Sequence, residues 1–238
     1  MKRLKLNRAI ILKALGFITI ALFIGYNGFG FFFGQNRYYR EIKNISVSSL
    51  SSELLLKDFS AASQFQNALF IGDSFTLALD NYGYLENNEF LAGIGYTSYD
   101  HVNYTYFPED LNPKRIFILL GINDLVQGYS PDEFIENYRE LLHVSKEIYP
   151  DAKIYVQSIA PVTASFEYIY EDRGNDQINE FNQMLKKLCQ KERIVMLNPW
   201  NAAKEESGAL AENLSSDGLH LNDQGHLLWL EQLLILLK

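Results

Sequence analysis

Residues 68–74 have the sequence ALFIGDS, four apolar residues followed by a Gly-Asp-Ser tripeptide that ends at Ser74. A short apolar run bounded in this way is typical of a buried parallel strand and the turn after it. Residues 116–124, IFILLGIND, repeat the arrangement and place Asn123 just beyond the apolar run. Ligands of open α/β sheets bind at the carboxyl ends of the strands, so we expect Ser74 and Asn123 to border one crevice.

Residues 217–220, DGLH, place Asp217 three residues before His220. The Asp-Gly pair favours a tight turn, in which the carboxylate can meet one imidazole nitrogen while the other stays free. A serine hydroxyl is a poor nucleophile and needs a base within hydrogen-bond reach, and the base needs a partner that fixes its tautomer. Ser74, His220 and Asp217 supply these three groups, and Asn123 supplies a donor for negative charge. The combination predicts a serine esterase.

Each motif has an ordinary structural alternative. A Gly-Asp-Ser tripeptide by itself is most often a turn with a helix cap, so Asp73 or Ser74 could simply cap a helix that begins at Phe75. Asn123 and Asp124 are equally ordinary in a loop after a strand. Only the occurrence of the motifs together, at strand ends, favours catalysis.

Two other kinds of site are disfavoured by the sequence. The Gly-x-Ser-x-Gly elbow of α/β-hydrolases is excluded because Thr76 stands where the second glycine would be. The sequence has no His-Glu-x-x-His motif, paired-cysteine motif or Walker loop. We therefore expect no metal and no cofactor.

The ordered motifs resemble those of the SGNH, or GDSL, hydrolases. Block I of that family is similar to residues 70–74, block III to residues 121–124, and block V to residues 217–220. The resemblance spans about residues 67–236. It implies that Ser74 is the nucleophile, with a base, an orienting acid and oxyanion donors supplied by the other blocks.

By this resemblance His220 is the base, Asp217 its orienting acid and Asn123 an oxyanion donor. Backbone N–H groups complete the oxyanion hole, one from Ser74 and one from a glycine of block II. That block matches loosely within residues 91–98, LAGIGYTS, where Gly95 fits best and Gly93 is the alternative.

Three further histidines are alternatives to His220 as the base. Asp223 and His226 repeat the Asp-x-x-His spacing, but an apolar helical pattern follows them, which favours a packed or capping His226. His143 lies in an amphipathic stretch and is expected on a helix surface. His101 follows block II among tyrosines, so it could line a substrate pocket or lie in a surface loop.

The N-terminus predicts a membrane anchor. Ala14–Phe33 is a run of 20 residues without charge, close to the ~20 that span a bilayer as a helix. Basic residues precede it and stay on the cytoplasmic side, so the rest of the chain should be extracytoplasmic. These residues are Lys2, Arg3, Lys5 and Arg8. A cleaved signal peptide is the alternative, although only Gly28-Phe29-Gly30 approaches a cleavage site.

Composition agrees with an exported domain. The formal net charge is −8, and the chain after residue 13 carries 16 basic against 29 acidic residues. Such a surface disfavours nucleic acid as a partner. The single cysteine, Cys189, excludes an internal disulfide and lies in a helical apolar pattern that suggests burial. An exterior protein without disulfides is more typical of bacteria.

The predicted organisation has three parts: residues 1–37 as cytoplasmic tip and transmembrane anchor, 38–66 as a polar linker or stalk, and 67–238 as the hydrolase domain. Apolar runs in the last part alternate with helical patterns, which favours a parallel sheet covered on both faces. The runs are Ala68–Ile71, Phe90–Ile94, Ile116–Leu120, Ile154–Ile159 and Ile194–Leu197. The resemblance implies a three-layer α/β/α sandwich with a flavodoxin-like, five-stranded sheet.

Three functions remain open at this point. The first is a membrane-anchored esterase that removes O-acetyl groups from a carbohydrate, its substrate being an acetylated glycan or a lipid ester. The second is an O-acetyltransferase of envelope polysaccharide that uses the same triad. The third is a non-catalytic glycan-binding protein, against which the presence of Ser74, Asn123, Asp217 and His220 together argues.

Overall fold

The computed structural model describes residues 65–85, 88–169 and 174–238. Five parallel strands form one sheet. They are β1 (Ala68–Gly72), β2 (Glu89–Ala92), β3 (Arg115–Leu119), β4 (Lys153–Gln157) and β5 (Val195–Leu197). The helices are α4 (Ser74–Asn81), α5 (Ser98–Tyr104), α6 (Ile122–Gln127), α7 (Pro131–Ile148), α8 (Ala164–Ile169), α9 (Asn175–Glu192) and α10 (Asp223–Leu236), with short 3₁₀ turns at Asn201–Ala203 and Glu212–Leu214.

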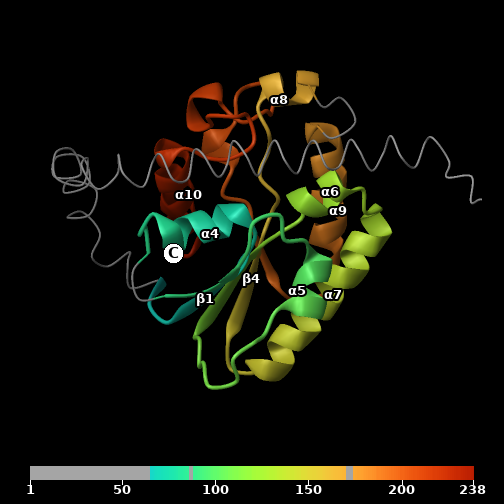
Figure 1. The fold of residues 1–238 in the computed structure, drawn as a ribbon, viewed down its shortest axis with the longest axis vertical. Helices are drawn as coiled ribbons and strands as arrows, with labels where there is room; N and C mark the ends of the chain where they lie inside the picture. Colours follow the sequence, from blue (N-terminus) through green and yellow to red (C-terminus); the bar gives the residue numbers. More distant parts are fainter. Residues whose placement is uncertain (1–64, 86–87, 170–173) are drawn as a thin grey trace, which may run out of the picture. The chain divides into compact units, whose positions relative to one another are not determined.

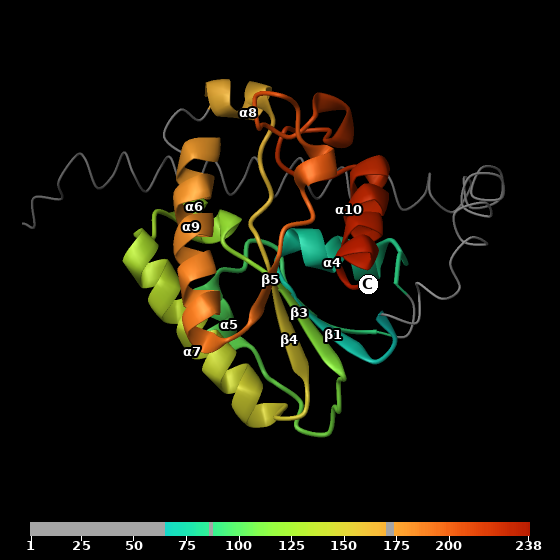
Figure 2. The ribbon, with the colours of Figure 1, turned by 180° about the vertical axis from the view of Figure 1, so that it is seen from behind.

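The strand order is β2-β1-β3-β4-β5, so the direction in which strands are added reverses after β2. Parallel crossovers are right-handed, and a reversal therefore moves the connecting helices to the other face of the sheet. Figures 1 and 2 show this arrangement, with α4 and α10 on one side of the sheet and α5, α7 and α9 on the other. The predicted three-layer α/β/α sandwich with a flavodoxin-like sheet is confirmed.

A row of aromatic rings fixes the register of the central strands. Phe70 of β1 stacks on Phe90 of β2 and on Phe117 of β3, with ring centroids 5.4 and 5.0 Å apart, and Phe117 stacks on Tyr155 of β4 at 5.2 Å. Each of these pairs is also a direct cross-strand pair of the ladder. Such pairs stabilise a sheet beyond the burial of their area, and a slip by one residue would turn every ring to the other face.

Local sequence signals account for the ends of the main helices. Ser130 caps α7 and exchanges hydrogen bonds with Glu133, and Pro131 occupies the first helical position. Asp73 caps α4 by accepting the N–H of Phe75 at 3.0 Å. The helix after Gly-Asp-Ser therefore begins at Ser74, with Asp73 outside it.

The predicted anchor, residues 1–37, and nearly all of the predicted linker, residues 38–66, lie outside the described residues. Within residues 65–238 that are described, none of the helices combines the length and apolar character needed to cross a bilayer.

Candidate active site

Ser74 is the first residue of α4, at the carboxyl end of β1. Its neighbours Asp73 and Phe75 are buried, whereas Ser74 itself is partly exposed. Because the Asp73 carboxylate makes the cap, the hydroxyl of Ser74 is not needed for that role. Gly72 lets the backbone pass close to its neighbours, since a Cβ there would overlap Thr76 and lie 2.8 Å from the carbonyl oxygen of Leu119.

Asp217 and His220 form a hydrogen-bonded pair. Oδ2 of Asp217 lies 2.7 Å from Nδ1 of His220, and Oδ1 accepts the backbone N–H groups of Leu219 and His220 at 2.9 and 2.7 Å. Gly218 turns the chain between them with a φ of 85°. The carboxylate can only accept, so Nδ1 carries the proton and Nε2 is left with a free lone pair.

The contact between Asp217 and His220 favours the charged form of both side chains, so it lowers the pKa of Asp217 and raises that of His220. Burial acts to lower the pKa of His220, but the hydrogen bond and charge of Asp217, with the charge of Asp73, raise it above the ordinary 6.5. Burial acts to raise the pKa of Asp217, but His220 and the two backbone donors lower it to about 2. Asp217 is therefore ionised at any physiological pH and stabilises the imidazolium.

His220 lies beside the N-terminus of α4. Its ring is 5.9 Å from the ring of Phe75, centroid to centroid, and the charge of Asp73 acts on it. These residues stand on either side of Ser74 in the chain. The fold thus brings block V to the helix turn that carries the serine.

Asn123 connects the ends of β1 and β3. It is the second residue of α6, and its Nδ2 donates to Oδ2 of Asp73 at 3.3 Å and to the carbonyl oxygen of Tyr96 at 3.2 Å. The carboxamide is thereby held against block I and block II together. A developing oxyanion would compete with the longer of these two bonds, the one to Asp73.

The glycine loop, residues 93–97, follows β2 and separates the two candidate glycines. The N–H of Gly93 donates to the carbonyl oxygen of Gly72 at 3.3 Å, so this donor is already engaged. Gly95 has a φ of 74°, a left-handed conformation that favours glycine, and its carbonyl accepts Nε2 of Gln127 at 2.9 Å. This geometry favours Gly95 as the oxyanion donor.

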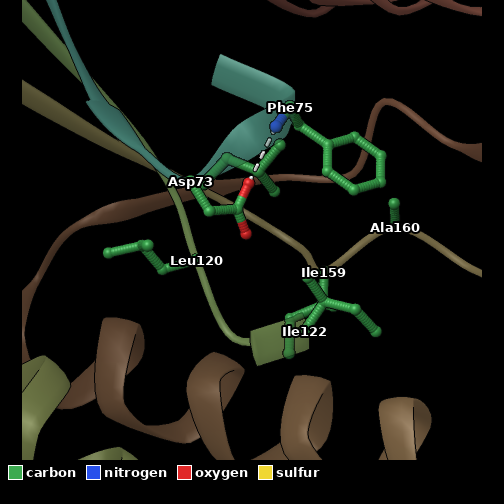
Figure 3. A pocket seen from close by; sticks show the side chains of 7 residues that line it. Asp73, Phe75, Leu120, Ile122, Ile159 and Ala160 are labelled. Carbon is green, nitrogen blue, oxygen red and sulfur yellow. Dashed lines mark hydrogen bonds between the residues drawn. The ribbon is translucent and has the colours of Figure 1, made fainter. Parts of the chain in front are cut away.

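A small apolar cavity lies beneath the serine turn, and Figure 3 shows Asp73 and Phe75 at its edge. Its other lining residues are Leu119, Leu120, Ile122, Ile159 and Ala160. Burial among them raises the pKa of Asp73 to about 7. Asp73 is thus a carboxyl group next to the serine that changes charge near neutral pH.

The remaining histidines are not placed to act as the base. His226 lies in α10 with Nδ1 2.9 Å from the carbonyl oxygen of Asn222 and its ring stacked on Tyr84 at 5.3 Å. Burial lowers the pKa of His226 to about 4. His143 is half-exposed on α7, as expected. His101 is fully buried, so it lies neither in a surface loop nor on an open pocket wall.

Two buried carboxylates were missed as site residues by the sequence reasoning. They are Asp73, beside Ser74, and Asp124, beside Asn123. Asp124 accepts hydrogen bonds from the backbone N–H and the hydroxyl of Ser98. Burial raises the pKa of Asp124 to about 6. Their position beside the motif residues was the only available signal, and it does not reveal burial. Among the residues in the described ranges, no cluster of His, Cys, Asp and Glu could hold a metal ion.

Residues 70–228 match the model of the GDSL-like lipase/acylhydrolase family. N-acylneuraminate cytidylyltransferase of Streptococcus agalactiae is 30% identical over 115 residues, which are 48% of this chain and 26% of that protein. The chain therefore spans about a quarter of the length of this relative.

Solved structures share the fold. A GDSL-like lipase from Bacteroides thetaiotaomicron superposes with a TM-score of 0.58 at 19% identity, covering 74% of this chain and 89% of that one. An acetylxylan esterase from Geobacillus stearothermophilus gives 0.54 at 18% identity, covering 71% and 93%.

The strand order, the serine at the end of β1 and the Asp-His pair are the features expected of a serine ester hydrolase. The chain belongs to the GDSL-like lipase/acylhydrolase family. The catalytic roles of the site residues are predictions: Ser74 as the nucleophile, His220 as the base, Asp217 as its orienting acid, and Gly95 and Asn123 as oxyanion donors.

Proposed function

We propose that this protein is a membrane-anchored, extracytoplasmic esterase that removes O-acetyl groups from a carbohydrate. The observation that carries the chemistry is the Asp217–His220 pair, which leaves Nε2 of His220 unprotonated beside the helix turn of Ser74. The substrate is inferred from the exposed tyrosines near the site, and the location from the N-terminal sequence.

The reaction proceeds through an acyl-serine. Nε2 of His220 takes the proton of Ser74 as Oγ attacks the acetyl carbonyl carbon, and the carbonyl electron pair moves to the oxygen. The imidazolium then protonates the sugar oxygen as the C–O bond breaks, which leaves acetyl-Ser74. Water, deprotonated by His220, attacks this ester in the same way and releases acetate and free Ser74.

Three donors stabilise the oxyanion in this scheme. Nδ2 of Asn123 and the N–H groups of Ser74 and Gly95 come from the ends of three neighbouring strands, so the sheet itself fixes their spacing. Preorganised donors of this kind lower the barrier most, because they need no reorganisation when the charge develops.

An exposed group of tyrosines supports a sugar substrate. Tyr99 is 37% and Tyr104 70% exposed, and the ring of Tyr99 lies 6.0 Å from that of Tyr104 and 6.3 Å from that of Tyr129. Tyr99 directly follows Ser98, which is bonded to Asp124 of the site. Aromatic faces with polar tips suit the amphipathic faces of sugar rings.

The comparisons support the same class of substrate. One structural neighbour is described as an acetylxylan esterase. The excess of acidic residues disfavours a polyanionic substrate such as nucleic acid.

The catalytic proposal is tested with the full-length chain in detergent. Wild type should release nitrophenol and acetate from nitrophenyl acetate, and Ser74→Ala and His220→Ala should each remove nearly all turnover while thermal unfolding stays cooperative, which shows that the variants fold. The double variant should lose little more than either single one, since the residues act as a unit. Ser74→Ala with full activity would contradict the proposal.

The substrate proposal needs a separate measurement. With an acetylated oligosaccharide, Tyr99→Ala and Tyr104→Ala should raise KM several-fold, and with nitrophenyl acetate they should leave it unchanged. Tyr106→Ala is the matched control, because Tyr106 is 78% exposed and is not part of the ring group. Equal effects on both substrates would reject the tyrosines as a sugar subsite.

The location follows from the N-terminal sequence alone. The protein should remain in the membrane fraction after a high-salt wash, and protease added to intact cells should reach the domain but spare residues 1–8. Release of a shortened soluble form would support a cleaved signal peptide instead.

A further inference from the structure

His101 is a fully buried polar side chain at the junction of block I and block II. It lies on α5, the helix that follows the glycine loop, and none of its surface is exposed. Its Nε2 lies 2.9 Å from the carbonyl oxygen of Gly72, and its Nδ1 lies 3.0 Å from Oγ1 of Thr105. Gly72 is two residues before Ser74 in the chain.

These two partners fix the tautomer of the ring. The carbonyl oxygen of Gly72 can only accept, so Nε2 of His101 must carry the proton. Nδ1 is then the acceptor, and the hydroxyl of Thr105 donates to it. Burial lowers the pKa of His101, which keeps the ring neutral at physiological pH.

The same carbonyl connects the serine turn to the glycine loop. The oxygen of Gly72 accepts both Nε2–H of His101 and the N–H of Gly93. The rings of Tyr96 and His101 pack edge-on, with centroids 5.3 Å apart. The backbone carbonyl oxygen of Tyr96 accepts a hydrogen bond from Nδ2 of Asn123. His101 therefore contacts the strand end that leads to the serine and the loop that holds the carboxamide.

We propose that His101 is a positioning residue, which sets the glycine loop and Asn123 at the correct distance from Ser74 by its hydrogen bond to the carbonyl of Gly72. The inference rests on the proposed function, since it needs Ser74 as the nucleophile. Rotation of the Gly72–Asp73 peptide would move the serine turn relative to the loop. A displacement of about 1 Å at a reacting centre can cost on the order of 10² in rate.

Packing alone does not explain a histidine here. An apolar side chain of similar volume would fill the space without the desolvation of two ring nitrogens, which costs free energy unless both are bonded. The purely structural alternative predicts that stability, rather than turnover, depends on His101. The variants below separate the two.

His101→Met removes the donor at similar volume, and His101→Gln retains a donor near the position of Nε2. With nitrophenyl acetate we expect His101→Met to lower kcat about 10²-fold with KM nearly unchanged, and His101→Gln to restore kcat to within a few-fold of wild type. His143→Met and His143→Gln are the matched controls on α7 and should leave kcat unchanged.

A spectroscopic measurement on the wild type keeps the inference testable if His101→Met fails to fold. The ¹⁵N chemical shifts of the imidazole nitrogens should identify His101 as the Nε2–H tautomer. The Nδ1–H tautomer would overturn the inference, as would a folded His101→Met with unchanged kcat. If Ser74→Ala were fully active, the proposed function would fail instead, and the tautomer would be unaffected.

Discussion

At the scale of single residues, Asp217 and Asp73 are two carboxyl groups of one site whose pKa values are shifted in opposite directions. Asp217 accepts four hydrogen bonds, from Nδ1 of His220, from the backbone N–H groups of Leu219 and His220 and from the hydroxyl of Ser215. The bonds from His220 and the backbone, with the charge of His220, outweigh burial and lower its pKa to about 2. Asp73 is buried, and its pKa is raised to about 7. The first stabilises the imidazolium that forms on His220 during the proposed reaction, and the second has a pKa near neutral pH.

Asp217→Asn should separate these contributions. The variant removes the charge that raises the pKa of His220 and can reverse the tautomer, so kcat/KM should fall by up to about 10⁴. In the wild type, kcat/KM should fall on acidification, with an apparent pKa above 6.5. Protonation of His220 and of Asp73 both contribute to this acid limb of the pH profile, because the two groups interact. The residual activity of Asp217→Asn should have its acid limb at lower pH. The measurement is a pH profile of kcat/KM, and an unshifted limb would reassign it to Asp73.

Asn123→Ala should lower kcat by about 10²–10³, because a donor to the oxyanion acts mainly in the transition state. KM should move little. Steady-state kinetics with nitrophenyl acetate measure both quantities. A change in KM alone would make Asn123 a substrate-binding residue.

The motif residues were predictable because each stands at a local boundary that the sequence marks. Ser74 and Asn123 follow buried strands, and Asp217 and His220 share one turn. The cap that Asp73 makes on the helix after it was a predicted alternative and is confirmed. The bond of Asp73 to Asn123 and that of His101 to Gly72 were not predictable, because the sheet brings these partners together from distant parts of the sequence.

At the scale of elements, all five strands lie within about two residues of their expected positions. The largest differences are at the ends of β2 and β4, where strands expected to reach Ile94 and Ile159 end at Ala92 and Gln157. Oδ1 of Asn182 on α9 accepts the N–H of Ile159 at 2.7 Å, and Nδ2 of Asn182 donates to the carbonyl oxygen of Ile159 at 3.1 Å. These two bonds stand where a neighbouring strand would otherwise pair with Ile159. A side chain 23 residues away cannot be read from a local apolar run.

The turn that starts α6 is the element on which Asn123 depends. Gly121 has a φ of 130°, and a Cβ there would overlap Ile159 and lie 3.1 Å from Phe134. Gly128, at the other end of α6, has a φ of 84° with open space around it. Both positions favour glycine, but only the first is also tightly packed.

Gly128→Ala should therefore cost about 1–2 kcal/mol of unfolding free energy, the strain of a left-handed residue, and leave kcat unchanged. Gly121→Ala should add overpacking of about 1–3 kcal/mol and also lower kcat, because the start of α6 must shift. Urea unfolding and nitrophenyl acetate kinetics on both variants test this. Equal loss of kcat in the two would show that α6 does not position Asn123.

At the scale of the whole molecule, the strand order explains why the site lies where it does. β1 and β3 are neighbours, and the chain leaves them toward opposite faces of the sheet, which opens a crevice at their carboxyl ends. Ser74 and Asn123 follow these two strands. The sheet order came from the family resemblance, since the alternation of strands and helices predicts a parallel sheet but not the order of its strands.

The crevice also concentrates groups that bind protons more tightly in the folded protein. Burial raises the pKa of Asp73 to about 7 and that of Asp124 to about 6, and the pKa of His220 is raised as well. Above their folded pKa values the two carboxylates are ionised although they are buried, and His220 has lost its favourable charge. All three therefore make the folded state less stable as pH rises toward 8.

The free energy of unfolding should consequently increase by about 1 kcal/mol between pH 8.5 and pH 6.5, since folding takes up protons over this window. Near and below pH 6.5 His226 and His101 oppose the trend, because burial lowers the pKa of both, that of His226 to about 4, and they stay neutral in the folded state while they take up protons in the unfolded chain. Below about pH 4 the loss of the Asp217 carboxylate destabilises the fold, since its pKa is lowered to about 2. Urea unfolding at several pH values measures the curve, and Asp73→Asn should flatten its neutral limb, because the pKa of Asp73 lies within that window. If the free energy of unfolding instead rises from pH 6.5 to 8.5, the prediction is wrong. That result would show that water reaches Asp73 and Asp124 in the folded protein and lets them ionise at little cost.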